Sequence, residues 1–86
     1  MAEVRDNFFY VKIFSPFEIY FEGEVSAVSA INETGPFDVL KDHANFISIL
    51  PAGSVKILTR FGKREVEISR GILRASNNKV TLFANV

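Results

Sequence analysis

The stretch GPFDVLKDHA, residues 35–44, lies near the centre of the chain and contains its only histidine. Gly35-Pro36 is compatible neither with the interior of a helix nor with a central strand, so it indicates a turn or bend. The apolar residues Phe37, Val39 and Leu40 are expected to return the chain to a core, and the polar residues 41–43 interrupt it a second time. Because the sequence on both sides is typical of strands, we expect the chain to cross the fold here.

Segments with strand character follow one another outward from this stretch in both directions. Apolar and polar residues alternate with a period of two, and turn-forming residues separate the segments. We expect strands over residues 8–14, 17–22, 24–31, 37–40, 46–50, 54–60, 64–69, 72–75 and 80–86. The pattern predicts an all-β fold, a flattened β-sandwich or barrel of about ten short strands in two sheets. Residues 8–86 form this single domain, after a frayed tail of residues 1–7.

The phase of the alternation predicts which side chains form the core. One face of the first segment carries Phe9, Val11 and Ile13. The corresponding core positions of the other segments are Phe17, Ile19, Phe21, Phe37, Val39, Leu40, Phe46, Val80, Leu82, Ala84 and Val86. Phe8, Tyr10 and Tyr20 have the opposite phase, and exposed aromatic side chains on a small β-domain suggest a protein partner.

Composition excludes several classes of protein. The chain of 86 residues suffices for one domain with one modest core. It has no Cys, so it has neither a disulfide framework nor a thiolate zinc site. No apolar run reaches the roughly 18–20 residues of a membrane span, and the N-terminus lacks the apolar region of a signal peptide. We expect a soluble, cytoplasmic protein.

Charge is zero overall but unevenly divided. The first 50 residues carry three basic and eight acidic side chains, and the remaining 36 carry seven basic and two acidic ones. Two faces of one small sandwich could complement each other, or the protein could present two differently charged contact surfaces.

Few residues are candidates for catalysis, metal binding or nucleic-acid binding. His43 lies beside Asp42 and close to Asp38, but a lone histidine in a loop is more often structural or part of an interface than a base or ligand. No spacing matches a known metal-ligand pattern. The tip 60–64, RFGKR, surrounds an aromatic ring with basic residues and could bind a nucleic-acid strand. A net-neutral domain lacks the basic footprint of that function, so a solvated hairpin tip is favoured.

Several motifs together resemble the N-terminal β-sandwich domain of the epsilon subunit of F-type ATP synthase. They follow one another in the family's order over residues 9–84. The matching segments are VKIFSP at 11–16, FEGEV at 21–25, GPFDVLKDHA at 35–44, LPAG at 50–53, SRGILRA at 69–75 and NKVTLFA at 78–84.

The resemblance implies a non-catalytic rotor subunit, without cofactor or metal, that links the gamma subunit to the c-ring of a proton- or sodium-translocating ATP synthase. It implies a peripheral position at the cytoplasmic face of the inner (cell) membrane, with membrane contact only through the complex, no nucleic-acid partner and no required homo-oligomer. Carried over by position, the gamma interface comprises Ser15, His43, Ala44 and Ser48. The turn facing the c-ring comprises Asn32, Glu33, Thr34, Gly35 and Pro36.

The sequence departs from the family's pattern within the central stretch and in one later turn. Asp38 replaces a Gly, Lys41-Asp42 replaces Pro-Gly, Asn45 replaces a Pro and Arg70 replaces a Gly. We therefore expect the turn geometry around residues 38–45 to differ. The chain ends at Val86, before the family's C-terminal helical hairpin, as in a naturally short or a truncated form. It is therefore expected to bind no ATP by itself. A free-standing β-module that binds a protein or nucleic acid through residues 60–64 is the alternative.

Overall fold

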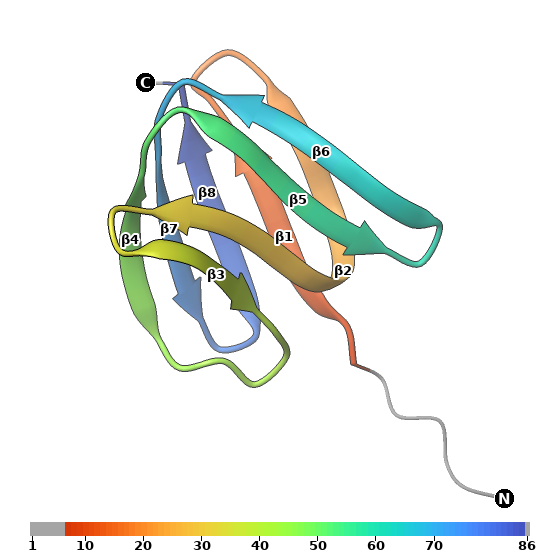
Figure 1. The fold of residues 1–86 in the computed structure, drawn as a ribbon. Coiled ribbons are helices and arrows are strands. Elements are labelled where there is room, and N and C mark those ends of the chain that lie inside the picture. Colours follow the sequence, from red (N-terminus) through yellow and green to blue (C-terminus); the bar gives the residue numbers. More distant parts are fainter. Residues whose placement is uncertain (1–6, 86) are drawn as a thin grey trace, which may run out of the picture.

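Residues 7–85 are described by a computed structural model, in which they form eight β-strands and no helix (Figure 1). The strands are β1 (Phe9–Phe14), β2 (Ile19–Asn32), β3 (Gly35–Val39), β4 (Phe46–Leu50), β5 (Gly53–Thr59), β6 (Gly62–Ile68), β7 (Gly71–Ser76) and β8 (Lys79–Ala84). The predicted all-β class is confirmed. The frayed tail was predicted for residues 1–7, and all of it except Asn7 lies outside the described residues, as does the predicted core position of Val86.

The strands form two layers of one continuous sheet. Its order is β4-β7-β8-β1-β2-β5-β6, and β3 also pairs with β2. The first half of β2 pairs with β1, whereas its second half pairs with β3 and β5. β2 therefore belongs to both layers, and β3, β5 and β6 lie in front of β1, β7 and β8 in Figure 1.

Residues 7–85 form eight strands rather than about ten. Of the nine ranges expected from the sequence, 17–22 and 24–31 are joined in the single strand β2, which begins at Ile19. Gly23, which lies between the two expected ranges, pairs with Val11 of β1 inside the continuous ladder. One long bent strand thus joins the layers that the sequence suggested were two separate sheets.

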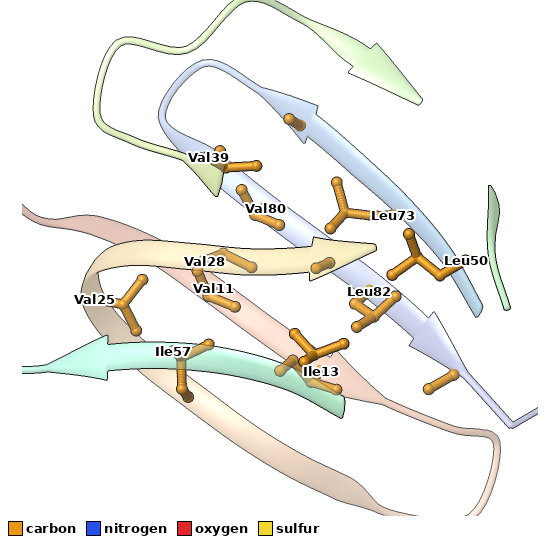
Figure 2. Packing of buried hydrophobic residues seen from close by; sticks show 14 of the residues in the cluster. Val11, Ile13, Val25, Val28, Val39, Leu50, Ile57, Leu73, Val80 and Leu82 are labelled. Atoms are coloured by element: carbon orange, nitrogen blue, oxygen red, sulfur yellow. The ribbon is translucent and has the colours of Figure 1, made fainter. Parts of the chain in front are cut away.

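The core lies between the two layers. Val11, Val28, Ile57, Leu73 and other labelled side chains from both layers point into the same space in Figure 2. The alternation predicted for β1 and β8 is confirmed, because Phe9, Val11, Ile13, Val80, Leu82 and Ala84 are all buried. Val39 is buried as well, and Phe21, Phe37 and Phe46 are partly buried against this cluster.

Three core predictions are wrong. The exposed fractions are 90% for Phe17, 54% for Ile19 and 57% for Leu40. Phe17 lies in the turn before β2 begins. At Ile19 the register of the β1–β2 pair shifts, with Phe14 opposite Ile19 but Ile13 opposite Phe21, so one residue of β2 is extra. A single extra residue exchanges the inward and outward faces of a strand. Leu40 follows the buried Val39, and consecutive residues of an extended chain point to opposite sides.

Tight turns join the last four strands as the sequence predicted. β5 and β6 pair from Thr59 opposite Gly62, with φ of 124° at Gly62. β7 and β8 pair from Ser76 opposite Lys79, and the two asparagines between them, Asn77 and Asn78, have φ of 51° and 58°. Two central residues with positive φ are the feature of a hairpin turn whose twist matches its strands.

Candidate functional site

The loop that contains His43 is fixed to the β7–β8 turn. Asp42 donates its backbone N–H to Asn78 Oδ1 at 2.6 Å, and Asn78 Nδ2 donates to Asp42 Oδ1 at 3.1 Å. Asn77 donates its backbone N–H to Asn45 Oδ1 at 3.2 Å. Asp42 stands where the family pattern has Gly, and its φ of 64° lies in the left-handed region that Gly favours and Asp tolerates.

His43 itself is half-buried against the start of β1. Its ring meets the ring of Phe9 edge-on, with centroids 5.6 Å apart. Nδ1 lies 3.2 Å from the carbonyl oxygen of Ala44, and Nε2 is buried without a hydrogen-bond partner. Asp38 instead accepts a hydrogen bond from Ser29, and residues 7–85 contain no group of three His, Asp or Glu side chains placed to hold a metal. His43 is thus positioned by packing.

The turn predicted to face the c-ring lies against β4. Asn32 Nδ2 donates to Ser48 Oγ at 3.0 Å, and Asn32 Oδ1 accepts from the backbone N–H and the hydroxyl of Thr34 at 2.9 and 2.7 Å. Glu33 and Pro36 are exposed. Pro36 lies inside β3, an edge strand that pairs only with β2, and edge strands are where a sheet tolerates proline. Asn32 therefore holds the turn in shape and joins it to Ser48.

Ser15 is buried, with an exposed fraction of 7%. Its hydroxyl accepts hydrogen bonds from the backbone N–H groups of Phe17 at 3.1 Å and Glu18 at 3.3 Å. This arrangement fixes the β1–β2 turn, which leaves Phe17 prominent beside it.

The residues predicted to contact gamma spread along one layer. His43 packs at the beginning of β1, and Ser15 follows its end. Ser48 is half-buried and pairs with the buried Leu73. It belongs to the inner row of β4, whereas its neighbours Ile47 and Ile49 are exposed. A single surface can include all of these positions only if it runs the length of this layer. Sequence reasoning did not single out the exposed isoleucines.

The basic tip at residues 60–64 is largely engaged with its own domain. Arg60 lies 3.4 Å from Glu24 Oε1 and 3.9 Å above the Phe8 ring, and Arg64 lies 5.5 Å from the ring centroid of Phe21. Phe61 is 97% exposed beside a groove of about 390 Å³. Pairing with Glu24 reduces the positive charge available to a nucleic acid, so the structure does not favour that alternative.

The fold defines a small β-sandwich whose exposed turns and strand faces can contact other proteins. The sequence model of the family described as ATP synthase, Delta/Epsilon chain, beta-sandwich domain matches residues 8–86. The chain belongs to this family, and the resemblance noted from its motifs is confirmed.

Relatives of two lengths match the chain. It is 34% identical over 76 residues to the ATP synthase epsilon chain of Ruthia magnifica subsp. Calyptogena magnifica, which covers 88% of this chain and 55% of that one. It is 33% identical over 79 residues to the ATP synthase epsilon chain of Chlorobaculum tepidum, covering 91% of this chain and 90% of the relative. The chain thus spans about half of the first relative and most of the second.

Two solved structures share the fold. A chain in the OSCP/F1/c-ring structure of Euglena gracilis mitochondrial ATP synthase has a TM-score of 0.82 and 17% identity, covering 96% of this chain and 53% of that one. A chain in the central stalk/c-ring structure of Tetrahymena thermophila mitochondrial ATP synthase has a TM-score of 0.73 and 16% identity, covering 90% and 63%. In residues 7–85, no helix could span a membrane.

Proposed function

We propose that this chain is a non-catalytic subunit of the central stalk of an F-type ATP synthase, where it links the gamma subunit to the c-ring at the cytoplasmic face of the membrane. The coupling ion is a proton or sodium. The chain requires no cofactor, no nucleic acid and no second copy of itself for this role, and it meets the membrane only through the complex.

The observation that carries the proposal is the family match over residues 8–86. The arrangement of the β2–β3 turn supports it. Glu33 projects at the turn while Asn32 is hydrogen-bonded to both Thr34 and Ser48, so an exposed carboxylate is presented on a backbone already held in one shape. A preorganised turn loses less conformational entropy when it contacts a partner.

Titration calorimetry with the folded gamma subunit of the same organism tests the first contact. We expect a one-to-one complex. Replacement of Ala44, which is exposed beside His43, by Arg should weaken it at least about tenfold, since a buried unpaired charge is costly at an interface. As a control, the exposed Ala52, which lies between β4 and β5, is replaced by Arg and should leave the affinity unchanged. The absence of any complex with the unchanged chain would contradict the proposal.

Binding of the preformed complex with gamma to c-rings in nanodiscs tests the second contact. Glu33→Gln should weaken binding to the c-ring severalfold without changing the affinity for the gamma subunit. Glu65→Gln on the exposed side of β6 is the matched control. Equal c-ring binding by the two variants would show that Glu33 makes no such contact.

A further inference from the structure

A polar hollow of about 280 Å³ lies where the β7–β8 hairpin turns. Its lining residues are Arg74, Ser76, Asn77, Lys79 and Thr81. They supply two cations, two hydroxyl groups and one amide, and no carboxylate. The cations are exposed, whereas Ser76 and Thr81 are half-buried. We call these five residues the hairpin hollow.

Strand pairing places the side chains of the hairpin hollow on one face. Arg74 pairs with Thr81, and Ser76 pairs with Lys79. Paired residues, and residues two apart along a strand, point to the same side. Arg74 and Lys79 are therefore diagonal neighbours, at a spacing of about 7–8 Å that long side chains can bridge. Lys12 of β1 pairs with Thr81 from the other side and adds a third cation at the border.

The two cations of the hairpin hollow lack a carboxylate that would neutralise them. Neither Arg74 nor Lys79 forms an ion pair within residues 7–85, and Lys79 Nζ lies 5.6 Å from the centroid of the Tyr10 ring. Glu22 lies beyond β1, opposite Lys12, and accepts a hydrogen bond from the Tyr10 hydroxyl. Like charges on neighbouring strands repel each other, so an anion between Arg74 and Lys79 would relieve this repulsion.

Other cations of the domain are placed beside acidic residues. Arg60 pairs with Glu24, and Lys56 stands opposite Glu65. Three further hollows in the described part of the chain contain cations, and each of them also contains a carboxylate. Part of the positive charge that the sequence concentrates in its last 36 residues is thus balanced within the domain. The charge of the hairpin hollow is not balanced in this way.

The turn that closes the hairpin hollow is already fixed. Asn77 donates its backbone N–H to Asn45 Oδ1, and the next residue, Asn78, is bonded twice to Asp42. Because the bond to Asn45 uses the backbone of Asn77, the side-chain amide of Asn77 stays available to the hollow. A site whose backbone is held in place loses less conformational entropy when it binds a ligand.

We propose that the hairpin hollow binds a phosphate group, either free in solution or in the headgroup of a phospholipid. The planar guanidinium of Arg74 matches two phosphate oxygens at once, and the ammonium of Lys79 supplies a compact second charge. The hydroxyl groups of Ser76 and Thr81 can donate hydrogen bonds to the remaining oxygens. This inference does not rest on the proposed function, which assigns the hairpin hollow no part.

Titration of the isotope-labelled chain with inorganic phosphate, followed by NMR, tests the site. Phosphate replaces chloride at constant ionic strength, so general screening stays the same. We expect saturable changes in the amide signals of Ser76, Asn77, Lys79 and Thr81. The double variant Arg74→Gln/Lys79→Gln should bind at least about tenfold more weakly.

The double variant Lys56→Gln/Lys63→Gln is the matched control. It removes the same amount of charge from exposed positions of β5 and β6, and it should bind phosphate like the unchanged chain. Thermal unfolding of both double variants checks that they are folded. Equal losses of affinity in the two double variants would show a general effect of charge and would overturn the site.

Sedimentation with vesicles distinguishes the two sources of the phosphate group. The vesicles contain phosphatidylcholine and phosphatidic acid in equal amounts, with pure phosphatidylcholine as the reference. Binding to the mixed vesicles that the Arg74→Gln/Lys79→Gln variant loses and the control keeps would assign a lipid headgroup. Saturable binding of inorganic phosphate without binding to the mixed vesicles would assign a soluble phosphate. If the unchanged chain binds neither, the inference is overturned, and the proposed function is unaffected.

Discussion

Gly71 provides a sharp test of the packing between β7 and β8. A Cβ atom placed on Gly71 would lie 3.0 Å from Leu82 Cδ1, 3.2 Å from the carbonyl oxygen of Phe83 and 3.5 Å from the Cα of Ala84. The Leu82 methyl can move by a few tenths of an ångström, but the backbone oxygen belongs to the paired strand and cannot move alone. Gly71→Ala should therefore destabilise the domain.

The expected magnitude follows from two opposing effects. Overpacking a core position costs about 1–3 kcal/mol, while removing a glycine recovers about 0.4–1 kcal/mol by restricting the unfolded chain. The free energy of unfolding should therefore fall by about 1–2 kcal/mol. For a domain of this size each kcal/mol shifts the midpoint of thermal unfolding by about 4–8 °C, so the midpoint should fall by roughly 5–15 °C.

Gly53→Ala is the matched control for thermal unfolding followed by circular dichroism. Gly53 also begins a strand and has no positive φ, but an added Cβ would meet nothing within 4 Å. We expect its midpoint to stay the same or to rise slightly. Equal midpoints for the two alanine variants would refute the reasoning, because the close contacts at Gly71 would then carry no cost.

Further changes test the turns and the core by urea unfolding. Asn78→Ala should cost about 1–2 kcal/mol, because it removes the side-chain bonds to Asp42 and places Ala at a φ of 58°; Asn78→Gly, which keeps the turn, should cost less. Ser15→Ala should cost about 1 kcal/mol by leaving two backbone N–H groups without their acceptor, and an unchanged midpoint would show that water replaces the hydroxyl. Leu73→Ala should cost about 2–5 kcal/mol at a position with 0% exposure, whereas Ile49→Ala, at 73% exposure, should cost less than about 1 kcal/mol.

The parts of the fold that could be predicted from sequence depend on local information. The alternation in β1 and β8 identifies their buried faces because each strand has one face in the core. The asparagines at 77 and 78 identify the last turn because Asn tolerates positive φ. The family motifs extend the prediction of the fold to the whole domain.

The remaining features depend on pairing between distant segments. Phe17 and Ile19 alternate as core residues do, yet Phe17 lies in the turn before β2 and the shift in register against β1 turns Ile19 outward. The continuity of β2 through Gly23 arises because Val11 pairs with it. The outer face of β4, β7, β8 and β1 shows the same limit, since Ile49 and Phe14 become parts of one surface only when β7 and β8 are placed between them.

The parallel pairing of β1 with β8 has a mechanical consequence. These strands are the first and the last of the domain, and they lie side by side from Tyr10 opposite Lys79 to Phe14 opposite Phe83. Tension applied between residues 7 and 85 would pull the two strands past each other along their lengths. All the hydrogen bonds of the pair would then bear the load together instead of opening one after another, so the domain should resist stretching from its ends far better than a hairpin peeled open from one side.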